Sequence, residues 1–136
     1  MSETISNEQA AAATGGVRIL LRLEGITLFA GMTLLYGLWD GSWLIYVLLF
    51  LAPDLSFAAY LAGPRAGAIV YNAAHSYLAP VALMTAGLAM ASPLLLSLAM
   101  IWLAHIGIDR ALGYGLKYAN GFAFTHLGRI GKDAVG

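Results

Sequence analysis

The sequence predicts an all-α protein, a four-helix transmembrane bundle with both termini in the cytoplasm. Of its 136 residues, 60% are hydrophobic and only 10% are charged, whereas soluble domains carry about 25% charged residues. Four apolar segments reach the roughly 20 residues that a helix needs to cross about 30 Å of hydrocarbon. No segment alternates with the period of two that is typical of a transmembrane β-strand. Because lipid offers no partner for backbone polar groups, the four segments are expected to be helices.

Turn and proline signals set the predicted helix boundaries. A Gly-Leu-Trp-Asp-Gly-Ser turn follows the first apolar segment, and Gly63-Pro64 ends the second, since proline disfavours helical geometry in the residue before it. Pro93 suits the first turn of the fourth helix. The predicted transmembrane domain, 17–113, contains helices at about residues 17–36, 43–62, 66–90 and 93–113. Residues 1–16 are predicted to form a disordered polar tail, and residues 114–136 a cytoplasmic tail at the membrane interface.

The basic residues predict the orientation. All seven Lys and Arg residues fall on one side of the four-helix arrangement, which the positive-inside rule assigns to the cytoplasm. They are Arg18, Arg22, Arg65, Arg110, Lys117, Arg129 and Lys132. We therefore expect a multi-pass protein of the inner (plasma) membrane. The formal net charge is zero, so nothing indicates a nucleic-acid partner.

Five ionisable residues interrupt the apolar spans. A charge at the bilayer centre costs about 2.5–3.5 kcal/mol, so such residues need partners, protons or a metal ion. At about 1.5 Å per residue, one residue from each helix lies roughly 10–13 Å from the cytoplasmic end: Glu24, Asp54, His75 and His105. Asp109 is shallower, about 5 Å in on the same arithmetic, and shares a helix face with His105. The agreement in depth predicts one shared site in the cytoplasmic half of the bundle.

The residue types predict a metal site. Cysteine is absent, which leaves His, Asp and Glu as the strong ligand types. Imidazoles combined with carboxylates suit zinc, iron or manganese. The predicted metal ligands are Glu24, Asp54, His75 and His105, and the predicted catalytic groups are Asp109 and His126. His126 could fold back under the bundle from the tail. Asn72 and Tyr71, which lie three and four residues before His75, are candidates to support its ring.

Several motifs resemble a known family. They are Arg-Leu-Glu-Gly at 22–25, Pro53-Asp54, Gly63-Pro64-Arg65, Tyr71-Asn72 with His75, and the segment 105–117 followed by Thr-His-Leu-Gly at 125–128. Over about residues 18–131 the chain resembles a bacterial family of small membrane proteins catalogued as a domain of unknown function. The resemblance implies a four-helix membrane protein and supplies no activity. More distantly, the intramembrane His and Asp residues are similar to those of membrane-bound metal-dependent hydrolases.

These features favour a metal-dependent enzyme acting on a lipid-type substrate in the bilayer. Zinc would activate water for hydrolysis of a lipid-linked ester or phosphoester, whereas iron in a bundle of this kind would support oxygen chemistry on an acyl or isoprenoid chain. The absence of GxSxG, Walker and dinucleotide motifs disfavours serine-hydrolase and nucleotide chemistry. The alternatives are a non-enzymatic carrier or sensor of protons or metal ions, and a structural subunit of a membrane complex. An oligomer is compatible with each of these functions.

Overall fold

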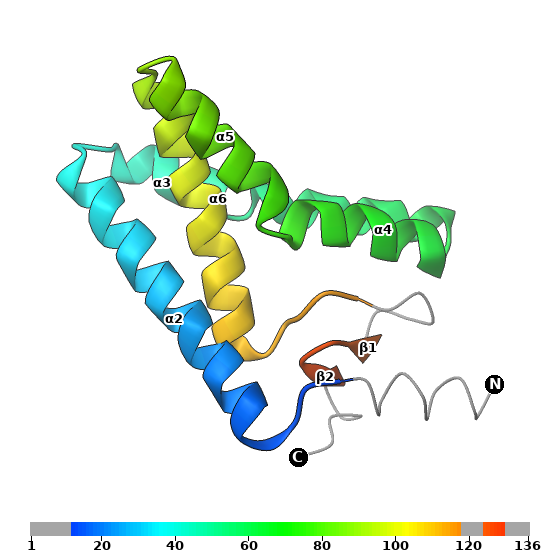
Figure 1. Cartoon of the computed structure of the whole chain (residues 1–136). Coiled ribbons are helices and arrows are strands. Elements are labelled where there is room, and N and C mark those ends of the chain that lie inside the picture. Colours follow the sequence, from blue (N-terminus) through cyan, green and yellow to red (C-terminus); the bar gives the residue numbers. More distant parts are fainter. Residues whose placement is uncertain (1–11, 118–123, 130–136) are drawn as a thin grey trace, which may run out of the picture.

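The computed structural model of the chain describes residues 12–117 and 124–129. Predictions that concern residues 1–11, 118–123 and 130–136, which include much of both tails, lie outside the described residues. The elements run in the order shown in Figure 1. They are α2 (Gly15–Leu38), α3 (Trp43–Phe50), the 3₁₀ helix η1 (Ala52–Ala62), α4 (Pro64–His75), α5 (Leu78–Ala89), α6 (Pro93–Leu112) and the two-residue strands β1 (Phe124–Thr125) and β2 (Gly128–Arg129).

Helix α6 is the centre of the fold, with α2 and α5 packed along it (Figure 1). Within residues 12–117 and 124–129, three segments are long and apolar enough to cross a membrane: Gly15–Leu38, Trp43–Ala62 and Pro93–Leu112. In the last of these, 56% of the most apolar window is buried, compared with 11% and 6% in the other two. The outer helices thus expose apolar side chains, as expected for surfaces that face lipid rather than water. The predicted helical membrane fold is confirmed.

The contact between α2 and α6 depends on two glycines. A Cβ atom added to Gly25 would lie 2.7 Å from the backbone oxygen of Gly107, and one added to Gly107 would lie 2.7 Å from the backbone oxygen of Gly25. Small residues of this kind let helix backbones approach closely in membrane proteins. This contact fixes the rotation of α6, and with it the direction of His105 and Asp109.

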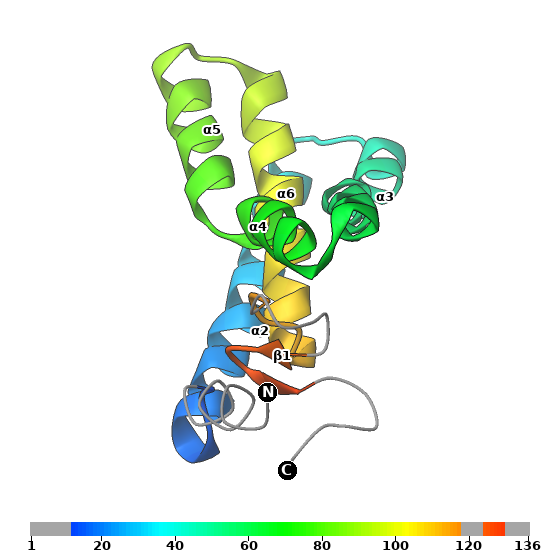
Figure 2. The ribbon, with the colours of Figure 1, turned by 90° about the vertical axis from the view of Figure 1, so that its right-hand side faces the viewer.

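The third predicted helix is divided in two. Instead of one helix over 66–90, α4 ends at His75, Ser76 is extended, and α5 begins at Leu78. The physical reason is Pro80, whose ring would clash with the carbonyl of Ser76 if the helix continued. Helix α4 therefore turns away from α5 (Figure 1), and Figure 2 views α4 nearly along its axis while α5 and α6 run up the page.

The second predicted helix changes character beside Pro53. Helix α3 ends at Phe50, and the chain continues as the 3₁₀ helix η1, with Asp54 in its first turn. Helix η1 packs along α4, and the contact is so close that a Cβ on Gly67 would overlap the ring of Tyr60. The break at Pro53 and the break before Pro80 together bring Asp54 and His75 next to α6.

Residues 124–129 lie near the C-terminal end of α6 (Figure 1). Strands β1 and β2 pair antiparallel, and Lys117 forms an isolated bridge with Thr125 (Figure 1). Lys117 and Leu127 are buried there. The sequence predicts a tail at this end but not these strands, which are too short to give an alternating pattern.

Candidate metal centre

Three elements from distant parts of the chain meet at four polar side chains. Asp54 comes from η1, His75 is the last residue of α4, and His105 and Asp109 lie one turn apart on α6. One ligand atom from each of the four residues lies within 4.8 Å of all the others. The prolines that interrupt the second and third predicted helices therefore also bring these side chains to one point.

Five of the six distances among these atoms are close to those of a tetrahedral coordination shell, and the sixth, between the oxygens of Asp54 and Asp109, is within 4.8 Å. His75 Nε2, His105 Nε2 and Asp54 Oδ1 form a triangle with all three sides 3.1 Å long. Asp109 Oδ2 lies 3.5 Å from His75 Nε2 and 3.2 Å from His105 Nε2, near the fourth corner. Ligands at 2.0–2.1 Å from a zinc ion, placed tetrahedrally, are about 3.3–3.4 Å apart. The four residues thus fit one small divalent cation.

The ring of His75 is held with one nitrogen free for an ion. Its Nδ1 donates to the backbone carbonyl of Tyr71 at 2.9 Å, which leaves the lone pair on Nε2 facing the cluster. Metal-binding histidines are commonly fixed by such a hydrogen bond on the other ring nitrogen. The Tyr71 ring stacks on His75 with centroids 3.8 Å apart and 11° between the planes. Tyr71 therefore supports the ring twice, in the role that the sequence predicts.

The side chains of the four cluster residues differ in their exposed fraction. The side chains of His75 and His105 are 3% and 1% exposed, compared with 16% for Asp109 and 33% for Asp54. His105 Nδ1 is buried and makes no hydrogen bond of good geometry with any described residue. The site therefore opens on the side of Asp54.

Two basic groups that are not among the predicted site residues lie beside the site. Arg110 donates from Nη2 to the carbonyl of His75 at 3.1 Å, where it satisfies the last carbonyl of α4. Lys117 Nζ lies 4.8 Å from the centroid of the Tyr71 ring. Burial lowers the pKa of Lys117 to about 8, against the opposing effect of the carboxylates of Asp109 and Asp54. The two cations balance the charge of the two carboxylates.

Asn72 fastens the tail to this side of the site. Its side-chain amide donates to the carbonyl of Lys117 at 2.8 Å and accepts from the Lys117 N–H at 2.6 Å. This paired contact places Lys117 under Tyr71. Asn72 thus acts on the tail rather than on the ring of His75, and the only sequence signal for this contact was its position on the face of α4 that carries His75.

Two predicted site residues lie outside the four-residue cluster. Glu24 is exposed on α2, because Gly25 faces α6 and the preceding side chain points in another direction. His126 does fold back beneath the bundle, but its Nε2 lies 3.1 Å from Arg110 and its Nδ1 accepts from the Leu116 N–H at 2.8 Å. It contacts the residue that follows Asp109 and not the cluster itself.

Fold and site together define a helical, membrane-embedded protein with a buried Asp-His-His-Asp group that could hold a metal ion. The chain belongs to the family described as domain of unknown function DUF4260, whose family model matches residues 18–130. Neither a curated protein nor a solved structure matches the chain. The similarity to membrane-bound metal-dependent hydrolases therefore stays a prediction.

Proposed function

We propose that this protein is a metal-dependent enzyme of the cell inner membrane that acts on a lipid-type substrate, with His75, His105 and Asp54 as metal ligands. The observation that carries the proposal is the triangle of their ligand atoms, 3.1 Å on each side. Three protein ligands with a fourth position for water are typical of catalytic zinc sites. Asp109, whose Oδ2 lies 3.5 Å and 3.2 Å from the Nε2 atoms of His75 and His105, would be placed beside such a water and would act as its general base.

The donor set narrows the identity of the ion. Two imidazoles and two carboxylates suit zinc, iron or manganese, whereas calcium prefers oxygen ligands and copper(I) prefers sulfur. Such an ion would supply Lewis acidity and a nucleophilic water. Arg110 and Lys117 make the surroundings of the site more positive, which favours a substrate with a negatively charged polar group.

The arrangement of charges supports the proposed orientation. Two arginines near the start of α2 lie at the C-terminal end of α6, which carries Arg110. Arg22 donates to the carbonyl of Ala111 at 2.8 Å, and Arg18 Nη2 lies 4.0 Å from a Cβ atom added to Gly113. The positive-inside rule assigns that end to the cytoplasm. The site would then open in the cytoplasmic half of the membrane.

Metal content tests this function. Detergent-purified protein is measured by inductively coupled plasma mass spectrometry beside the double variant His75→Ala, His105→Ala, with folding checked by circular dichroism and size-exclusion chromatography. We expect near-stoichiometric zinc, iron or manganese in the native protein and its loss in the variant. If neither protein binds any of the three ions after reconstitution, the metalloenzyme proposal is wrong. The 3.1 Å contacts would then favour the alternative of a proton-sharing network.

A further inference from the structure

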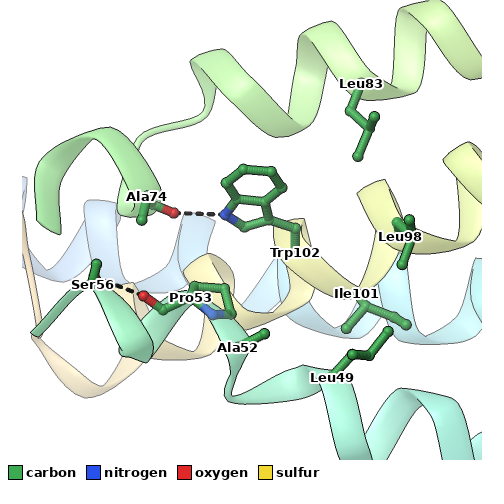
Figure 3. A pocket seen from close by; sticks show the side chains of 9 residues that line it. All are labelled: Leu49, Ala52, Pro53, Ser56, Ala74, Leu83, Leu98, Ile101 and Trp102. Carbon is green, nitrogen blue, oxygen red and sulfur yellow. Dashed lines mark hydrogen bonds between the residues drawn. The ribbon is translucent and has the colours of Figure 1, made fainter. Parts of the chain in front are cut away.

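An apolar cavity of about 380 Å³ lies next to the candidate metal centre. Figure 3 shows its walls, which come from α3, η1, α4, α5 and α6. Aliphatic side chains form much of the lining, among them Leu49, Leu83, Leu98 and Ile101. The cavity is partly open, and much of its lining belongs to Trp43–Ala62 and Pro93–Leu112, two segments long and apolar enough to cross a membrane.

The cavity and the four-residue cluster are built on the same three elements, η1, α4 and α6. Pro53 lines the cavity and Asp54 follows it, while Ala74 lines the cavity and His75 follows it. On α6, Trp102 lies about one turn before His105. These neighbours in sequence place one wall of the cavity beside the cluster, although no cluster residue is itself among the lining residues.

The polar groups of the lining have partners within the wall. Trp102 Nε1 donates to the carbonyl of Ala74 at 2.6 Å, and the Ser56 hydroxyl donates to the carbonyl of Pro53 at 2.7 Å (Figure 3). Because both donors are satisfied, the lining presents no group that calls for a polar ligand. Apolar cavities of this kind do not hold water well. The occupant that fits is a hydrocarbon.

The extent of the cavity favours a lipid chain over a protein partner. A transmembrane helix is about 10–12 Å wide and needs a groove along its length, whereas nine residues line this cavity of about 380 Å³. A single hydrocarbon chain can enter such a space from the surrounding bilayer.

We propose that this cavity binds one hydrocarbon chain of a bilayer lipid, whose polar end then lies at Asp54. The inference deepens the proposed function, on which it rests for the chemistry at the polar end, while binding of the chain requires no metal. A lipid chain gains little hydrophobic free energy on leaving one apolar medium for another. The cavity therefore contributes by positioning the lipid chain relative to the metal centre rather than by binding it tightly. It favours substrates with a single chain near the reacting group.

Photo-crosslinking in the membrane tests the inference. The probe is a phosphatidylglycerol with a diazirine in one acyl chain, incorporated into vesicles with the full-length protein and mapped by mass spectrometry. We expect labelling of α6 near Leu98 and of α5 near Leu83. In Leu98→Trp the indole fills the cavity, and labelling of α5 should fall by at least about fivefold. The matched control is Leu34→Trp, in a separate apolar groove between α2 and α3. This variant should leave the labelling of α5 unchanged.

The outcomes separate the two proposals. Unchanged labelling in both Leu98→Trp and a second filling variant, Leu83→Trp, each shown to be folded by circular dichroism, would overturn the chain-binding inference. Labelling that spreads evenly over all exposed helices would do the same, because it would represent ordinary lipid contact. Metal content is measured on the same samples. Specific labelling without bound metal would support binding of a lipid chain in the cavity and reject the metalloenzyme proposal. Bound metal without specific labelling would support the metalloenzyme proposal and reject chain binding.

Discussion

His75 and His105 direct their Nε2 atoms at each other across 3.1 Å, although 30 residues separate them in the chain. The Nδ1 of His75 is occupied by the Tyr71 carbonyl, so its Nε2 lone pair faces the second imidazole and the carboxylate of Asp54. Because lone pairs that face each other at this distance repel, either a shared proton or a metal ion must lie between these groups. A divalent ion held by His75, His105 and Asp54, with its water beside Asp109, would satisfy all four groups at once.

Replacing single carboxylates by amides distinguishes residues that bind the metal ion from residues that do not. Asp54→Asn should lower metal affinity by at least about 100-fold, since even changes to groups around the ligands cost 10–100-fold. Glu24→Gln should leave the metal content unchanged, because Glu24 is exposed and lies outside the cluster. Metal titration of the two folded, metal-free variants measures both effects. Equal loss in the two variants would mean that Glu24 is a ligand after all.

The packing of α2 on α6 should be sensitive to one methyl group. In Gly107→Ala the new Cβ would lie 2.7 Å from backbone atoms of Gly25 and Phe29, which cannot move independently. Overpacking of this kind costs about 1–3 kcal/mol. Gly31→Ala is the control, since no atom lies within 4 Å of its added Cβ. Thermal unfolding in detergent should show a lower midpoint for the first variant only. Equal midpoints would contradict the close contact.

Most of the site is predictable from the depth of each residue in the membrane. Asp54, His75 and His105 were expected in one layer because helices of known direction fix how far each residue lies from the cytoplasmic end. Depth contains no information on rotation, however, and Glu24 has the right depth on a face of α2 that points elsewhere. Its rotation follows from the contact of Gly25 with α6, which only the packed structure reveals.

The division of the third helix had a signal in the sequence. Pro80 removes a backbone donor and obstructs the carbonyl of Ser76, which predicts a break four residues earlier. The long apolar run around Pro80 nevertheless predicts one continuous helix, because mean hydropathy indicates the length of a membrane span and not a break within it. The roles of Arg110 and Lys117 are not predictable from the sequence, since they depend on contacts between residues distant in the chain, Arg110 with His75 and Lys117 with Asn72.

Asn72 should hold the tail in place. Asn72→Ala removes both hydrogen bonds to the backbone of Lys117, at a cost of about 1–3 kcal/mol. Hydrogen exchange of the Lys117 amide should accelerate roughly fivefold or more. Ser76→Ala, which removes an exposed 3.4 Å contact on the same segment, should change it little. If the Lys117 amide exchanges at the native rate in Asn72→Ala, the paired contact does not fasten the tail.

Acid should release the tail through His126. Burial, and then the nearby Arg110 guanidinium, lower the pKa of His126 to about 4, compared with about 6.5 in an unfolded chain. The unfolded tail therefore binds more protons between these values. The stabilisation is fully present above about pH 6.5 and is lost as the pH falls toward 4. Protonation also removes the Nδ1 lone pair that accepts from the Leu116 N–H.

The Leu116 amide reports this change locally, apart from any titration of the four-residue cluster. Its protection from hydrogen exchange, corrected for the intrinsic pH dependence, should fall by up to roughly twentyfold between pH 7 and pH 5. In His126→Gln the protection should be lower at pH 7 and nearly independent of pH. A pH dependence that persists in His126→Gln would assign the titration to another group. Constant protection in the native protein would mean that His126 is not held neutral by burial beside Arg110.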